Sequence, residues 1–176
     1  MKAAVQPSNI PAESHIFTQL KDAYYSDAYS YTEQNPSSAM QIWLSQVATI
    51  PNWVNLLMTA RNGIVSRLGL KHLGHISDVD QSKAASAYQV GDSVGIFTIK
   101  SLAEQEVILI DSDKHLDVQI SIFKASDDSQ LVTISSVVHV HNFFGEFYMT
   151  MITPLHKLIV PATIKRALLS RSDCPS

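Results

Sequence analysis

The stretch that decides the fold runs from Leu131 to Leu169 and reads LVTISSVVHVHNFFGEFYMTMITPLHKLIVPATIKRALL. Its first part, Leu131–His141, is rich in β-branched residues and predicts a strand. Phe143–Phe144–Gly145 then predicts a tight turn, and Glu146–Thr153 a second strand. Pro154–Leu155–His156 predicts the start of a helix to Leu169, because proline is favoured in the first helical turn. A long helix directly after antiparallel strands predicts a sheet curved around a C-terminal helix.

The rest of the chain supplies the other parts of this α+β architecture. Ala23–Tyr31 is aromatic and alternating, which predicts a first strand. Ser38 and Gln41 have the spacing of a capping box, so two short helices are expected after that strand, at 39–49 and 51–68. Polar turns between apolar runs predict hairpin-linked, antiparallel strands, at Val94–Ile99, Glu106–Ile110 and Leu116–Phe123. We expect an extended arm at 1–15, one domain at 16–169 and a disordered tail at 170–176.

Composition limits the classes of function. Of the 176 residues, 45% are hydrophobic and only 16% are charged, which favours a large interior or an apolar cavity. A net charge of −3 gives no support to nucleic-acid binding. No apolar run reaches the roughly 18 residues of a membrane span. The only cysteine is Cys174, and Met1–Glu13 lacks the pattern of a signal peptide, so we expect a cytoplasmic protein.

The two faces of the Leu131–His141 strand differ in character, because side chains alternate along a strand. We expect one apolar face to point at the C-terminal helix, together with matching residues of the preceding strand: Val118, Ile120, Ile122, Val132, Ile134, Val138 and Val140. His139 and His141 then point outward. His139-x-His141 with Glu146 resembles the ligand set of metal-binding cupins. The flanking glycines of that motif and the second half of its barrel are missing, so we predict no metal and no cofactor.

Three residues are candidates for chemistry. His156 opens the expected helix, where the positive end of the helix dipole favours a neutral ring able to act as a base. The same position also suits a histidine that only holds the helix against the sheet. Tyr148 and Arg61 are the other two candidates, and Arg61 has the alternative of an ordinary salt bridge. A ligand cavity between sheet and helix would be lined by apolar and aromatic residues, for which we select Trp53, Leu57, Phe97, Ile120, Val138, Tyr148 and His156.

The order of elements is similar to that of the START-like, or helix-grip, superfamily, which includes polyketide cyclases and plant pollen-allergen-like proteins. A closer resemblance, over about residues 15–169, is to an uncharacterised bacterial family known as domain of unknown function 2867. Four short motifs carry it: Arg61–Val65 with Leu68–Gly69–Leu70, His115–Leu116–Asp117, His141–Asn142 with Gly145 and Tyr148, and Pro154–Leu155–His156. The resemblance implies a helix-grip cavity and brings no established catalytic residues.

These observations predict that the protein binds a small hydrophobic or amphipathic molecule in that cavity. Two alternatives stay open. One is an enzyme on the same fold, such as a cyclase, isomerase or hydrolase. The other is a module that docks on a protein partner, either a reductase or a second copy of the chain. Some members of the resembled family follow an NAD(P)-binding dehydrogenase-like domain, whereas this chain has no G-x-G-x-x-G motif. The ligand, any reaction and the oligomeric state are not readable from the sequence.

Overall fold

One antiparallel sheet with the strand order β1-β2-β7-β6-β5-β4-β3 organises the molecule. The computed structural model describes residues 4–34, 37–65, 79–80, 82–126 and 130–172, without the side chains of 60–65 and 171–172. The strands are β1 Gln6–Pro7, β2 Tyr25–Thr32, β3 Ser93–Val94, β4 Phe97–Leu102, β5 Glu106–Ser112, β6 Leu116–Lys124 and β7 Leu131–Val140. The helices are α1 Ala39–Ala48, α2 Asn52–Val65 and α3 Phe143–Ser172, with 3-10 turns η1 His15–Leu20 and η3 Ala85–Ala87.

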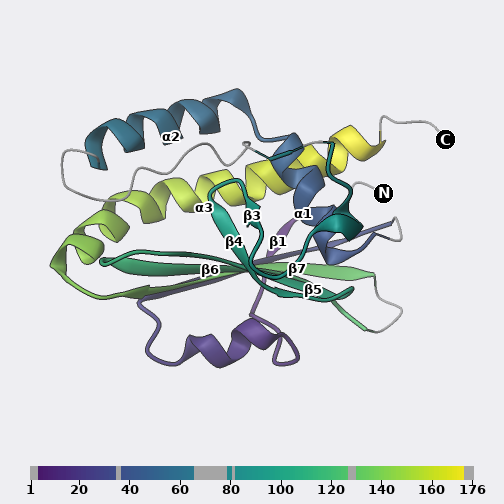
Figure 1. Ribbon diagram of the computed structural model, residues 1–176, viewed down its shortest axis with the longest axis horizontal. Helices are drawn as coiled ribbons and strands as arrows, with labels where there is room; N and C mark the ends of the chain where they lie inside the picture. Colours follow the sequence, from purple (N-terminus) through teal and green to yellow (C-terminus); the bar gives the residue numbers. More distant parts are fainter. Residues whose placement is uncertain (1–3, 35–36, 66–78, 81, 127–129, 173–176) are drawn as a thin grey trace.

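The predicted fold class is confirmed: the chain is α+β, with a curved antiparallel sheet and a long C-terminal helix. Figure 1 shows α3 along one face of the sheet, α2 above α3 in this view, and η1 on the opposite face. The first long strand, β2, pairs with the last strand, β7. This pairing brings the beginning and the end of the domain together, so residues more than a hundred positions apart in sequence lie side by side.

The two short helices after β2 lie where they were predicted. Ser38 caps α1 as expected: its side chain accepts a hydrogen bond from the Gln41 backbone N–H, and the Gln41 side chain accepts one from the Ser38 N–H. A capping box of this kind satisfies amide groups that have no partner within the helix. The predicted stop of the second helix at Gly69 lies outside the described residues, as does Cys174.

The predicted strand at Glu146–Thr153 is wrong, because α3 is already helical from Phe143. Asn142 starts the helix: its side-chain Oδ1 accepts a hydrogen bond from the Gly145 N–H, as an N-cap residue does. Met149, Ile164 and Ala167 are buried at helical spacing. Packing of this stripe outweighs the strand preference of the β-branched and aromatic residues there. The helix continues through Pro154 and Pro161, so His156 lies well inside it rather than in its first turn.

The predicted inner face of the sheet is confirmed. Val132, Ile134 and Ile122 belong to the main core together with Ile164 of α3, and Val118, Ile120 and Val160 pack against it. Val138 packs with Met149 of α3, and Val140 lies against that pair. The opposite face is also covered, because Ile16 of η1 packs on Ile108 and Val137. The buried Glu106 carboxylate fixes this cover by accepting hydrogen bonds from Ser14 Oγ and the His15 N–H.

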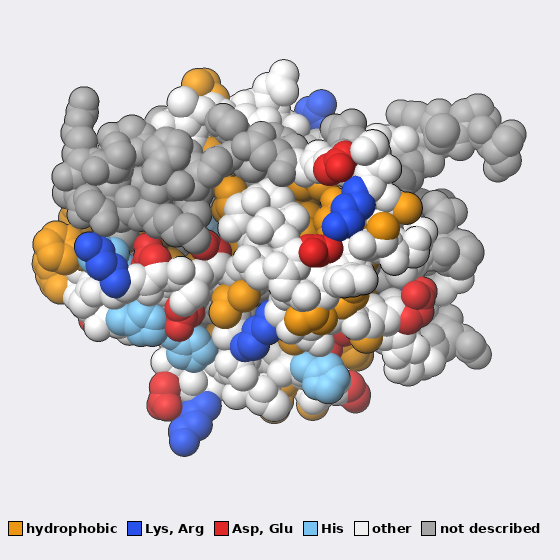
Figure 2. All heavy atoms as spheres, viewed as in Figure 1, with side chains coloured by type: hydrophobic (Ala, Val, Ile, Leu, Met, Phe, Trp, Pro, Cys, Tyr) orange, Lys and Arg blue, Asp and Glu red, His pale blue; other side chains and the backbone are white. Residues whose placement is uncertain are grey.

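The visible surface has no dominant charge. On the face drawn in Figure 2, acidic and basic side chains are interspersed among apolar and neutral ones over the coloured residues. Within the described part of the chain, no helix combines the length and the apolar character needed to cross a membrane.

Candidate functional site

A cavity of about 220 Å³ lies between the inner face of the sheet and the three α-helices. Its walls are mainly apolar, and residues of the sheet, α1, α2 and α3 all contribute to them. The apolar and aromatic lining residues include Trp43 and Val47 of α1, Val54 and Met58 of α2, Phe97, Val118, Ile120, Ile134 and Val138 of the sheet, and Met149, Ile152 and Val160 of α3. Polar groups are few among the lining residues that the structure describes.

Five of the seven residues selected from the sequence lie on the cavity wall: Phe97, Ile120, Val138, Tyr148 and His156. Trp53 and Leu57 do not line it. Residues next to each other in a helix point about 100° apart, and α2 turns the neighbouring Val54 and Met58 towards the cavity instead. Trp53 is consequently exposed. The side chain of Arg61, the third catalytic candidate, lies outside the described part of the chain.

A polar cluster of four side chains interrupts the apolar wall. Asp27 of β2 lies directly opposite Ser136 of β7 in the sheet register. The Tyr25 hydroxyl donates a 2.7 Å hydrogen bond to Asp27 Oδ2. His156 of α3 places its Nε2 atom 3.4 Å from the same Oδ2 atom and 3.3 Å from Ser136 Oγ. We call Tyr25, Asp27, Ser136 and His156 the polar cluster; of its members, all except Asp27 reach the cavity wall.

The electrostatics of the polar cluster keep Asp27 ionised. Burial alone would raise the pKa of this carboxyl group. The hydrogen bond and positive charge of His156, with hydrogen bonds from Tyr25 and Ser136, outweigh burial and hold the pKa of Asp27 below its ordinary value. Burial, followed by the hydrogen bond to Asp27, raises the pKa of the Tyr25 hydroxyl far above its ordinary value. Tyr25 therefore stays a donor and Asp27 an acceptor at neutral pH.

The position of His156 differs from the sequence prediction, and so does its environment. It was expected among the free amide groups of a helix start, but α3 begins at Phe143. The helix dipole therefore gives no reason for a neutral ring. Its surroundings are instead the Asp27 carboxylate, the Ser136 hydroxyl and the edge-to-face ring of Tyr25, whose centroid lies 5.8 Å away. An imidazole beside a carboxylate and an apolar cavity can bind a polar group or transfer a proton.

Sequence reasoning did not select Tyr25, Asp27 or Ser136, although a signal was present. Tyr25 and Asp27 share the parity of the aromatic side chains of their strand, and Ser136 interrupts the Val132, Ile134, Val138 and Val140 face. Parity predicts which face a residue occupies. It does not predict which strand lies alongside, and only the pairing of β2 with β7 joins these residues.

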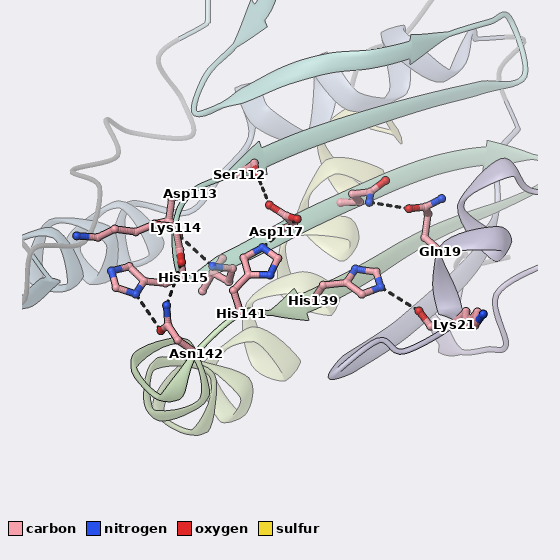
Figure 3. Close-up of polar contacts among 12 residues, drawn as sticks. Gln19, Lys21, Ser112, Asp113, Lys114, His115, Asp117, His139, His141 and Asn142 are labelled. Carbon is pink, nitrogen blue, oxygen red and sulfur yellow. Dashed lines mark hydrogen bonds and ion pairs between the residues drawn. The ribbon is translucent and has the colours of Figure 1, made fainter.

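The outer histidines have local partners, as Figure 3 shows. His139 Nε2 lies 3.1 Å from the Lys21 carbonyl oxygen, and His141 Nε2 lies 3.1 Å from Asp117 Oδ2. Glu146, the third ligand of the cupin-like alternative, lies in the first turn of α3 and not on a neighbouring strand. Among the described residues, no group of three or more His, Cys, Asp and Glu side chains is placed to hold a metal ion.

The fold and the site together define the class of protein. It is an α+β protein in which a curved sheet and a C-terminal helix border an apolar cavity with the polar cluster at its wall. A family model described as "Protein of unknown function (DUF2867)" matches residues 19–163, so the chain belongs to that family. The match spans all four residues of the polar cluster. No curated protein and no solved structure matches the chain.

Proposed function

We propose that the protein binds a small, mainly apolar molecule in the cavity between the sheet and α3. The observation that carries this proposal is the cavity itself, with a mainly apolar wall and a few polar groups that include the polar cluster. Binding pockets for small molecules have this composition, because apolar walls supply the affinity and a few polar groups fix the orientation. The apolar part of the ligand would contact Ile120, Ile134 and Met149, and its polar group would face His156.

The size of the cavity restricts the ligand. A volume of about 220 Å³ is below the roughly 300 Å³ at which drug-sized pockets begin. We therefore expect a compact ligand of one or two rings, or a short branched chain, and not a long-chain lipid.

We further propose that the family belongs with the START-like, helix-grip proteins. The order of strand, two helices, a run of hairpin-linked strands and a long helix supports this placement. So does the pairing of the first long strand with the last. The cavity lies between sheet and helix, where that resemblance implies a ligand.

Native mass spectrometry of protein purified from its own host tests the binding proposal. We expect an adduct of low mass that is released on unfolding. Ile120→Phe, which fills part of the cavity, should reduce the adduct. Leu158→Phe adds bulk at an exposed position of α3 and should leave it unchanged. Absence of an adduct, together with no quenching of Trp43 fluorescence by compact aromatic compounds, would contradict the proposal.

A further inference from the structure

We propose that His156, oriented by Asp27, acts as a general base on the molecule bound in the cavity, so that the protein abstracts a proton from a neutral, compact, apolar substrate. This inference rests on the proposed binding function and adds a reaction class and named roles to it. His156 is the catalytic residue. Asp27 is a positioning residue, because it acts through the imidazole.

We assign the ring proton of His156 to Nε2 from the contacts of that nitrogen. With the ring proton on Nε2, this nitrogen donates towards Asp27 Oδ2 at 3.4 Å, because an ionised carboxylate can only accept hydrogen bonds. The Tyr25 hydroxyl donates to the same oxygen at 2.7 Å. With the proton on Nε2, the lone pair of the neutral imidazole lies on Nδ1. The pairing of an imidazole with a carboxylate that sets its tautomer is the arrangement that activates histidine bases in enzymes.

The other ring nitrogen is available to a substrate. No hydrogen bond joins Nδ1 of His156 to any described residue. This atom is not among the buried polar atoms that lack a partner, so part of its surface is accessible. The side chain is 25% exposed, and the residue lies on the cavity wall. Proton uptake at Nδ1 creates an imidazolium, which the adjacent Asp27 carboxylate stabilises.

Charge around the cavity selects a neutral substrate. No Lys or Arg occurs among the described residues that line it, and the Asp27 carboxylate lies 3.4 Å from His156 Nε2. An anion at His156 would be buried close to the Asp27 carboxylate, which is unfavourable. Tyr25 and Tyr148 are also titratable groups on the wall, and both are neutral in their protonated form.

The chain contains a second histidine–aspartate pair that serves as a control. His141 and Asp117 are 3.1 Å apart, yet His141 is 42% exposed and does not belong to the cavity wall. Figure 3 shows this pair with Ser112 on the outer side of the sheet. A base there meets bulk water and no apolar substrate, so the pair should contribute nothing to the reaction.

The test uses 5-nitrobenzisoxazole, a compact neutral compound that reports on general bases in apolar cavities. The base takes the proton on the ring carbon C3. The C–H electron pair completes a nitrile as the N–O bond breaks, and the oxygen leaves as a coloured phenolate. The imidazolium then returns its proton to water, so no other reactant is needed. Binding is measured separately with 5-nitroindole, an inert compound of similar shape, through Trp43 fluorescence in a Trp53→Phe background.

We expect the wild-type protein to accelerate the elimination roughly a hundredfold or more over buffer. His156→Gln should reduce the rate to the buffer value, and Asp27→Asn should reduce it about tenfold or more, while both variants still bind 5-nitroindole. His141→Gln should match the wild type. In Asp27→Asn the loss should fall on kcat with KM unchanged, which a purely structural role for Asp27 would not cause.

The outcomes separate the two proposals. Binding of 5-nitroindole without elimination, or a His156→Gln variant that keeps the wild-type rate, overturns the inference and leaves the binding proposal standing. Failure of both compounds to bind overturns both proposals. If His156→Gln does not fold, Asp27→Asn decides, because a folded Asp27→Asn variant that keeps the wild-type rate also overturns the inference.

Discussion

Replacing Gly145 by alanine tests two features of the structure: the start of α3 at Phe143 and the contact that holds this end of the helix to the sheet. An alanine Cβ at this position would lie 2.5 Å from the His115 carbonyl oxygen and 2.8 Å from Val140 Cγ1. The oxygen cannot easily retreat, because it accepts a 2.8 Å hydrogen bond from the His141 N–H. Glycine therefore permits the first turn of α3 to sit directly on the β5–β6 connection.

Two opposing effects set the change in the free energy of unfolding. Glycine to alanine inside a helix normally stabilises by about 1 kcal/mol. Forcing a methyl group into a filled contact costs about 1–3 kcal/mol, and here the obstacle is hydrogen-bonded backbone. This obstacle places the cost at about 2–3 kcal/mol, in the upper part of that range, and subtraction of the gain of about 1 kcal/mol leaves a net destabilisation of about 1–2 kcal/mol. For a protein of this size, that lowers Tm by roughly 3–6 °C.

Urea unfolding followed by circular dichroism measures the effect. Thr150→Ala, an exposed position in the same helix, is the control and should be near neutral. If Gly145→Ala were as stable as the wild type or more so, the close approach of α3 to His115 would be wrong.

Three further predictions concern the polar cluster, α1 and the N-terminal cover. The pKa of Asp27 lies below its ordinary value, so Asp27 contributes stability that is present above pH ~3.8 and is lost as the pH falls through the lowered value. The difference in unfolding free energy between wild type and Asp27→Asn should therefore shrink on acidification, and a constant difference would contradict this. Tyr25→Phe removes a 2.7 Å hydrogen bond to that carboxylate, so it should raise the pKa of Asp27 in a carbon-13 NMR titration and cost about 2 kcal/mol; an unchanged titration would show that the hydrogen bond is unimportant. Ser38→Ala should cost about 1 kcal/mol in urea unfolding through loss of the capping box, whereas Ser170→Ala, near the other end of the chain, should cost little.

The sequence by itself determined the features that depend on neighbours along the chain. Alternation along Leu131–His141 placed the inner valines against α3 correctly. The spacing of Ser38 and Gln41 predicted the start of α1. Strand parity and helix caps are local properties, so a few consecutive residues contain all the information that they need.

Only the tertiary structure decided how residues 143–153 fold and where the polar cluster forms. These residues have a strand-like composition, yet packing of Met149 against Leu116 and Val138 of the sheet makes them helical. Asp27 and Ser136 are unremarkable on their own in sequence, and His156 was selected for a position at a helix start that it does not have. They lie together because β2 pairs with β7 and because α3, which begins at Phe143, runs along the inner face of the sheet and places His156 there. Long-range pairing and helix packing depend on the whole chain, and no local pattern contains them.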